Sequence, residues 1–218
     1  IKNLVNKDQK RTQKKKIIFS TLLVLMLLPI VGMSFAAAGF AIWANGVNLD
    51  KSLLPTASAK PVFYDINGEK IEYLTDDYIL PDQIPDDLKN AFIALEDKRF
   101  YSHKGYDPIR IGGAIISNIK SRSVKEGAST ITQQLVKNTH LSNERTIKRK
   151  LKEIAIARKL EKEYSKDEIL ALYLSVIYFG NGAYGVKQAS RLYFDKEISD
   201  LSLQECATLA GIVKNPRK

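Results

Sequence analysis

Glu96 stands in a setting that suits proton transfer. It opens a run in which acidic and basic residues crowd the end of a predicted helix, with Phe100 and Tyr101 following directly. A carboxylate beside buried aromatic rings is a common arrangement for a general acid or base. The alternative is a solvated cluster of Glu96, Lys98 and Arg99, which composition alone favours.

Glu153 ends the run Arg-Lys-Leu-Lys-Glu at residues 149–153. On a helix, Arg149 and Lys150 precede it by four and three residues, so the three side chains share a face. Apolar residues fall on two sides of this helix: Ile156 and Leu160 near Glu153, and Ile147, Leu151 and Ile154 nearly opposite. The pattern predicts packing on both sides and partial enclosure of Glu153. The alternative is a surface salt bridge worth under about 1 kcal/mol.

Residues 127–138 read Gly-Ala-Ser-Thr-Ile-Thr-Gln-Gln-Leu-Val-Lys-Asn. A glycine-led helix start offers free backbone N–H groups to an anion, and Ser129 and Thr130 add hydroxyl donors. An ordinary helix cap would explain Ser129 but not the adjacent Gln133 and Gln134. The segment is therefore a candidate anion-binding site.

Composition excludes several other kinds of site. His103 and His140 are the only histidines and Cys206 is the only cysteine, which argues against a zinc site and a disulfide framework. The formal net charge is +10, of which residues 1–16 carry +6, so the remaining chain carries +4. The basic block adjoins an apolar segment rather than a DNA-reading motif, so nucleic acid is not an expected partner.

Residues 17–44 contain no charged side chain. As a helix they would extend about 42 Å, enough to cross a hydrocarbon core of about 30 Å. The basic residues before them predict a cytoplasmic tail at 1–16 and everything after residue 45 outside. The alternative is a cleaved signal peptide, with 17–28 as its apolar core and the alanines at 36–38 as the cleavage site.

The remaining chain must position these groups. A polar tether is predicted at 45–60, and a β-hairpin at 61–74 around Asn67-Gly68. Asp86 is a predicted helix cap, and Ser165 with Glu168 and Ser202 with Glu205 are predicted capping boxes. Helices are predicted at 87–99, 108–120, 129–140, 143–164, 166–178, 182–193 and 201–213. The fold class is therefore mainly α, with a small membrane-proximal β-hairpin.

Five segments, taken in order, resemble the peptidoglycan glycosyltransferase family (glycosyltransferase family 51). They are Glu-Asp-Lys-Arg-Phe…His-x-Gly at 96–105, residues 127–138, Arg-Lys-x-x-Glu at 149–153, Tyr-Leu…Tyr-Phe-Gly at 173–180, and Leu-Ala-Gly at 209–211. The resemblance runs from about residue 62 to 216. It implies a lysozyme-like helical domain over 61–218, with a lobe partly embedded in the outer membrane leaflet. It leaves open whether a transpeptidase domain follows, as in class A penicillin-binding proteins, or not, as in monofunctional transglycosylases.

The resemblance also implies an activity, the polymerisation of lipid II into β-1,4-linked glycan with inversion and release of undecaprenyl pyrophosphate. Glu96 matches the base that deprotonates the acceptor 4-hydroxyl. Glu153 matches a glutamate on the pyrophosphate side, acting directly or through a divalent cation such as Mg²⁺ or Mn²⁺; no cofactor is otherwise required. The matched basic residues near the donor phosphates are Lys137, Arg149 and Lys150. The matched substrate-binding residues of the cleft are Ser129, Gln133, Gln134, Asn138 and His103. Ser175 departs from the family pattern, which usually has Asn.

The implied partners are lipid II, the lipid-linked glycan chain, the phospholipid bilayer, moenomycin-type inhibitors and other cell-wall synthesis proteins. The implied location is a cell membrane, with the catalytic domain extracellular or periplasmic. Two other functions remain open: a lysozyme-like lytic enzyme, and a catalytically idle scaffold, against which Glu96 and Glu153 argue.

Overall fold

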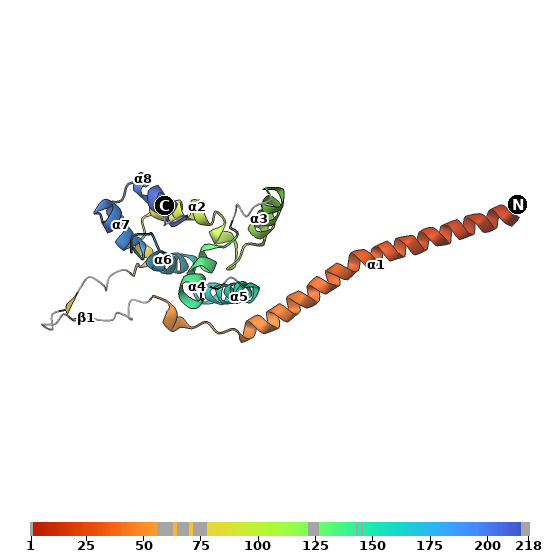
Figure 1. The fold of residues 1–218 in the computed structure, drawn as a ribbon, viewed down its shortest axis with the longest axis horizontal. Helices are drawn as coiled ribbons and strands as arrows, with labels where there is room; N and C mark the ends of the chain where they lie inside the picture. The colour runs from red at the N-terminus through yellow and green to blue at the C-terminus, as the bar shows by residue number, and fades with distance from the viewer. Residues whose placement is uncertain are drawn as a thin grey trace. The chain divides into compact units, whose positions relative to one another are not determined.

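The computed structural model describes residues 2–55, 63–64, 70–71, 78–121, 127–142, 144 and 146–214. The chain divides into two compact units, Ile1–Val47 and Asn48–Lys218. Figure 1 shows the first unit as a single helix and the second as a group of shorter helices.

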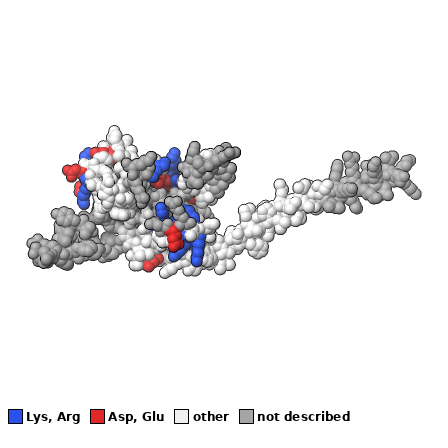
Figure 2. All heavy atoms as spheres, viewed as in Figure 1, with Lys and Arg blue, Asp and Glu red and all other residues white. Residues whose placement is uncertain are grey.

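Helix α1 (Lys2–Gly46) continues from the basic tail through the apolar segment without a break. Within it, Ile18–Gly46 has a mean hydropathy of 2.3 and is long and apolar enough to cross a membrane. The Ser34 hydroxyl donates to the Ile30 carbonyl at 2.8 Å, so this polar group is satisfied inside the helix. The face of the helix seen in Figure 2 carries no coloured charge along its described length. These features fit both a membrane anchor and a signal sequence.

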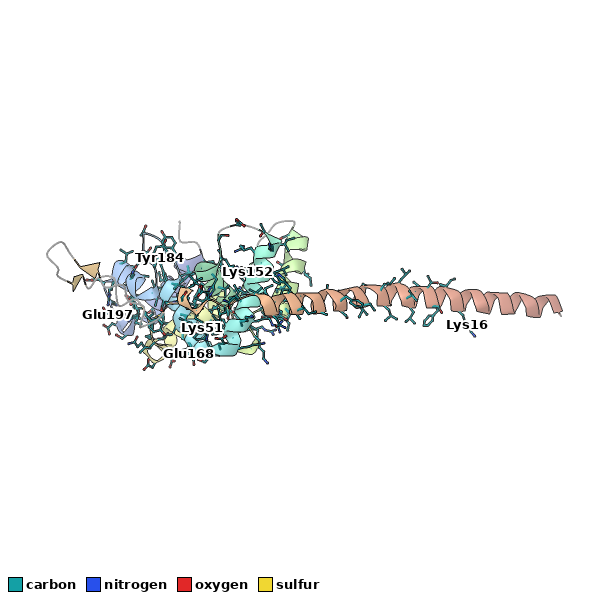
Figure 3. The ribbon with its side chains drawn as sticks, turned by 90° about the horizontal axis from the view of Figure 1, so that it is seen from below. Lys16, Lys51, Lys152, Glu168, Tyr184 and Glu197 are labelled. Atoms are coloured by element: carbon teal, nitrogen blue, oxygen red, sulfur yellow. The ribbon has the colours of Figure 1, made fainter. Side chains whose placement is uncertain are left out.

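Of the predicted tether at 45–60, residues 48–55 form the start of the second unit. Leu49 and Leu54 are buried, and η1 (Lys51–Leu53) follows Asp50 as its N-cap. The imidazole of His140 bonds the Asp50 carbonyl at 2.9 Å. Lys51, labelled in Figure 3, pairs with Glu163 at 2.5 Å. These contacts fix the start of the second unit to two of its helices.

The predicted hairpin is confirmed as an antiparallel pair. Strand β1 (Phe63–Tyr64) pairs with β2 (Lys70–Ile71), with Phe63 opposite Ile71 and Tyr64 opposite Lys70. The predicted Asn67-Gly68 turn lies outside the described residues.

Every predicted helix of the second unit is present, with ends that move by at most four residues. The helix predicted at 143–164 begins at Ile147. Thr146 is its N-cap, because the Thr146 hydroxyl oxygen accepts from the N–H of Arg149. The helices and 3₁₀ turns are η3 (Pro81–Gln83), α2 (Asp86–Glu96), η4 (Phe100–Ser102), α3 (Pro108–Ser121), α4 (Ile131–His140), α5 (Ile147–Glu163), α6 (Lys166–Val176), α7 (Val186–Phe194), η5 (Ile198–Asp200) and α8 (Leu203–Lys214).

The capping predictions have mixed outcomes. The Ser165–Glu168 capping box is confirmed, and Ser202 and Glu205 exchange the corresponding hydrogen bonds. The Asp86 cap is wrong, since Pro85 occupies the cap position and Asp86 is the first helical residue. An acidic residue there still favours the positive end of the helix dipole.

The core of the second unit is built on α6, whose residues from Ile169 to Ser175 are all buried. Helix α4 packs against both α5 and α6, and α2 packs against α8, an arrangement that can be followed in Figure 1. The Phe92 ring on α2 meets Tyr173 and Phe179 edge-on at centroid distances of 6.2 and 6.1 Å. The core therefore ties the helix that ends in Glu96 to α6.

The predicted packing of helix α5 on two sides holds only in part. On the side of Glu153, Ile156 and Leu160 are buried. On the opposite side Ala155 is buried and Ile154 is half-buried, whereas Ile147 is 82% and Leu151 is 39% exposed.

Ser175, the departure from the family pattern, has a structural role. Its hydroxyl donates to the Ala171 carbonyl at 2.8 Å and accepts from the Ile79 N–H at 3.1 Å. It therefore attaches the segment before η3 to α6. A Cβ on Gly185 would lie 2.7 Å from the Ser175 carbonyl, and Gly185 has φ +81°, so this close approach requires glycine.

Candidate active site

Glu96 is the last residue of α2 and remains partly exposed. Its Oε2 accepts a hydrogen bond from Nε2 of Gln134 on α4 at 2.7 Å. The Arg110 guanidinium donates to the backbone carbonyl of Glu96. The carboxylate is therefore held in place and still accessible, as a general base requires.

The first turn of α4 is built on Thr130, which the structure places as the N-cap instead of Ser129. The Thr130 hydroxyl oxygen accepts from the Gln133 N–H at 3.1 Å, and the Gln133 side-chain oxygen accepts from the Thr130 N–H at 3.2 Å. The Ile131 N–H donates to the Asp97 carboxylate at 3.0 Å. Three backbone N–H groups of this helix start, those of Thr130, Ile131 and Gln133, thus bond protein atoms and are not free to bind an anion.

Glu153 lies inside the second unit with 1% of its surface exposed. Its Oε1 accepts from Nε2 of Gln133 at 3.0 Å and from the Lys150 ammonium. Its Oε2 lies 3.6 Å from Nη1 of Arg149. Lys150 also donates to the Ser129 hydroxyl at 2.8 Å. The predicted enclosure is confirmed, and the surface salt-bridge alternative is wrong.

Gln133 and Gln134 therefore make hydrogen bonds that a helix cap alone does not explain. The two amides are adjacent on α4, and each donates to one of the two glutamates, Gln133 to Glu153 and Gln134 to Glu96. Lys137 and Asn138 follow one turn later on the same helix and are exposed to solvent.

His103 does not fit its assignment to substrate contact. Its side chain is 2% exposed, and its Nε2 bonds the buried Asp97 carboxylate at 2.8 Å. Asp97 in turn accepts from the start of α4, so His103 supports the site from within the protein.

Gly105, two residues after His103, has a backbone role. It has φ +88°, and a Cβ there would lie 2.8 Å from the carbonyl of Ala157 on α5. Its own carbonyl accepts from the Thr130 hydroxyl at 2.8 Å. Glycine at this position therefore brings the segment after Glu96 against α4 and α5.

Sequence reasoning missed Arg110 and the role of Asp97. Arg110 lies in the first turn of α3, whose N–H groups at Ile109 and Arg110 bond Asp107 at 2.9 and 3.1 Å. The arginine approaches Asp97 at 3.8 Å. Asp107 before Pro108 is a recognisable helix start, but nothing in its spacing links the following arginine to Glu96.

Glu96 lines two pockets, of about 390 and 330 Å³. Leu95, Glu96 and Arg110 are common to both. The larger is completed by Ala114, Gly127, Ser129, Gln134, Val213 and Lys214, and the smaller by Lys98, Arg99, Asp107 and Ile109. Basic side chains therefore accompany the glutamate on both sides.

The surroundings of Glu153 do not fit a resident divalent cation. Both carboxylate oxygens already face donors, and two of these donors, Lys150 and Arg149, are cations that would repel a metal ion. Within the described ranges, no cluster of three or more His, Cys, Asp or Glu residues could hold a metal. Mg²⁺ or Mn²⁺ stays a prediction, and the groups that face the Glu153 carboxylate here are an amide and two basic side chains.

Comparison with known proteins identifies the family. The family model described as Transglycosylase matches residues 66–218. The chain belongs to the transglycosylase family. The matched segment contains Glu96, Glu153 and every other site residue predicted from the sequence. A mainly helical, lysozyme-like transglycosylase domain is thus confirmed.

The chain as a whole is similar to parts of larger proteins. It is 43% identical over 215 residues to penicillin-binding protein 1A/1B of Bacillus subtilis, and the match covers 96% of this chain and 23% of that protein. It is 40% identical over 218 residues to penicillin-binding protein 1A of Clostridium botulinum, covering 96% and 26%. It is also 41% identical over 206 residues to penicillin-binding protein 1F of B. subtilis, covering 93% and 28%. The chain thus spans about a quarter of the length of these curated relatives.

Proposed function

We propose that this transglycosylase domain polymerises lipid II into β-1,4-linked glycan strands, with inversion at the donor sugar and release of undecaprenyl pyrophosphate. The observation that carries the proposal is the place of Glu96, an accessible carboxylate in the wall between two pockets that both contain basic side chains. A reaction between two pyrophosphate-bearing substrates needs a base between two anion-tolerant sites. A lytic enzyme acting on an uncharged part of a glycan needs no such pair.

In the proposed reaction, a Glu96 oxygen removes the proton of the acceptor 4-hydroxyl. The acceptor oxygen forms a bond to C1 of the donor sugar while the bond from C1 to the pyrophosphate oxygen breaks, and the pyrophosphate leaves with the electron pair. Because pyrophosphate is a weakly basic leaving group, cations can stabilise it without a protonating acid. Lys150 and Arg149, which Glu153 holds, are suited to this role.

The direct test supplies lipid II to the full chain in detergent. We expect long glycan strands and free undecaprenyl pyrophosphate, resolved by gel and by thin-layer chromatography. Sugar fragments released from preformed peptidoglycan, with no polymer from lipid II, would support the lytic alternative. A folded protein that turns over neither substrate would support the scaffold.

We further propose that α1 is an uncleaved anchor, with residues 1–16 in the cytoplasm and the catalytic domain outside the membrane. The seven basic residues of the tail support this orientation. An anchored domain would work at the bilayer surface, where lipid II, the lipid-linked glycan and cell-wall synthesis proteins meet. Moenomycin-type phosphoglycolipids would compete for the basic side of the site.

Exposed apolar side chains support contact of the catalytic domain with lipid. Ile109 and Ile116 lie seven residues apart on α3, hence on one face, and are 64% and 57% exposed. On α5 the exposed Ile147 and Leu151 alternate with the exposed lysines at 148 and 152, the second of which is labelled in Figure 3. Apolar residues rimmed by cations are typical of surfaces that bind anionic lipid.

Replacing the exposed isoleucine of α3 that lines neither pocket tests this contact. In Ile116→Asn we expect the polymerisation rate in phospholipid vesicles to fall several-fold, while the rate in detergent micelles stays within twofold, because only the vesicles present a bilayer for α3 to enter. Leu192→Asn, at the similarly exposed Leu192 of α7, is the matched control and should change neither rate. Equal losses in vesicles and micelles would show that Ile116 serves the site itself.

A further inference from the structure

Tyr173 is a buried residue of α6 whose hydroxyl reaches the active site. Its side chain has no exposed surface, and its ring packs edge-on against Phe92. The hydroxyl donates to Oε1 of Gln134 at 3.4 Å. A tyrosine hydroxyl in a core normally requires a partner, and this partner is the glutamine that contacts Glu96. Burial, followed by the charges of Glu96 and Asp97, raises the pKa of Tyr173 well above its usual value, so the hydroxyl stays a donor.

The contact with Tyr173 holds the oxygen end of the Gln134 amide, while the nitrogen end bonds Glu96. An amide can turn its oxygen or its nitrogen towards a neighbour, and only the nitrogen can donate to a carboxylate. With its oxygen facing the Tyr173 hydroxyl, Gln134 presents Nε2 to Oε2 of Glu96 at 2.7 Å. The reversed amide would place its oxygen against the Glu96 carboxylate with no hydrogen between them, and its nitrogen against the Tyr173 hydroxyl, which could then only accept.

Gln133 is oriented in the same way. Its oxygen accepts from the Thr130 N–H at 3.2 Å, and its Nε2 donates to Glu153 at 3.0 Å. Each glutamine therefore has its oxygen anchored by a buried donor and its nitrogen on a glutamate. For Gln133 the anchor is a backbone N–H that only a proline would remove, whereas for Gln134 it is a side chain.

We propose that Tyr173 is a positioning residue for glycan polymerisation: by anchoring the Gln134 oxygen, it directs the Gln134 nitrogen to one oxygen of Glu96 and leaves the other for the acceptor hydroxyl. The proposal rests on the function proposed above. Tyr173 does not touch substrate in this role, and its effect on the reaction passes entirely through Gln134.

A double-mutant cycle separates this role from packing. Tyr173→Phe removes the hydroxyl and keeps the ring against Phe92. We expect kcat to fall about tenfold with KM for lipid II within about twofold, because the base is misdirected while the substrate pockets are unchanged. In a Gln134→Met background, which has no amide to orient, the same substitution should change kcat by less than twofold.

Tyr193→Phe is the matched control, because its hydroxyl donates to the Phe179 carbonyl at 2.9 Å and bonds neither glutamine. We expect its kcat to equal that of the original protein. An equal loss from Tyr173→Phe in both backgrounds would assign Tyr173 to packing and overturn the proposal, as would the absence of any loss.

A second measurement does not depend on turnover. In the full chain in micelles, the side-chain amide protons of Gln134 should exchange with water faster in Tyr173→Phe than in the original protein, as followed by NMR. Unchanged exchange would overturn the proposal even if the chain does not polymerise lipid II. Faster exchange in an inactive chain would support the orienting contact and reject only the function.

Discussion

Glu96→Gln is expected to abolish measurable polymerisation, with a fall in rate of about 10²–10⁴-fold. The amide cannot accept the proton of the acceptor hydroxyl. Folding should be preserved, because Glu96 is partly exposed and the new amide oxygen can still accept from Gln134. The Arg110 contact uses the backbone carbonyl of residue 96 and does not change. We expect the free energy of unfolding to stay within about 1 kcal/mol.

The measurement compares the initial rate of lipid II consumption with the thermal midpoint of the same preparation. Glu197→Gln is the matched control, since Glu197 is an exposed glutamate that pairs with Arg191 and does not line either pocket. It should leave both quantities unchanged. A near-normal rate for Glu96→Gln would remove Glu96 from the role of base and require another group beside the acceptor hydroxyl.

Local patterns in the sequence were enough to predict the helices and the contacts around Glu153 within its own helix. The spacing of Arg149, Lys150 and Glu153 placed the three on one face, and the structure has them in contact. The Ser165–Glu168 cap followed from two residues three positions apart. Such features are predictable because they depend on a single turn of helix.

The prediction failed where two competing local signals had to be weighed. Ser129 and Thr130 are both good cap residues, and Thr130 is chosen because Gly105 supplies an acceptor for its hydroxyl. The apolar residues of α5 predicted a second packed side, but apolar periodicity does not say how far the packing extends along a helix. Ala155 is buried on that side, whereas Ile147 is exposed.

Contacts between residues far apart in the chain were beyond sequence reasoning. Tyr173 lies 39 residues from Gln134, and Gln134 lies 38 residues from Glu96. Each residue has an ordinary local explanation, as part of an apolar helix or a polar one. The packing of α4 against α6, and of Phe92 on α2 against Tyr173, brings these groups together.

This packing gives α4 a central place in the site. Its adjacent residues Gln133 and Gln134 point in directions about 100° apart on the helix, so each can reach a different glutamate. A shift of α4 would therefore disturb Glu96 and Glu153 together. Asp97, which accepts from the Ile131 N–H at 3.0 Å, fixes the start of α4 against the residue that follows Glu96.

Glu153→Gln is expected to lower the polymerisation rate of the folded protein by about 10²–10³-fold. The charge of Glu153 holds Lys150 and Arg149 at the side of the site that would receive the pyrophosphate. A neutral amide would release both cations and turn an N–H₂ group towards one of the donors. Because the carboxylate is buried, we also expect a loss of about 1–3 kcal/mol in the free energy of unfolding.

Glu161→Gln is the matched control. Like Glu153, Glu161 is a largely buried glutamate of α5 that accepts from a residue of α4 and from a lysine. Its side chain is 6% exposed on the same α5, and it accepts from the Thr132 hydroxyl at 2.6 Å and from Lys166 at 2.7 Å. It should cost comparable stability and leave the rate per folded molecule unchanged, because its partners are Thr132 and Lys166 and not the two cations that Glu153 holds. If the two variants had equal rates after correction for the folded fraction, Glu153 would be a structural residue. Cations other than those it holds would then stabilise the leaving group.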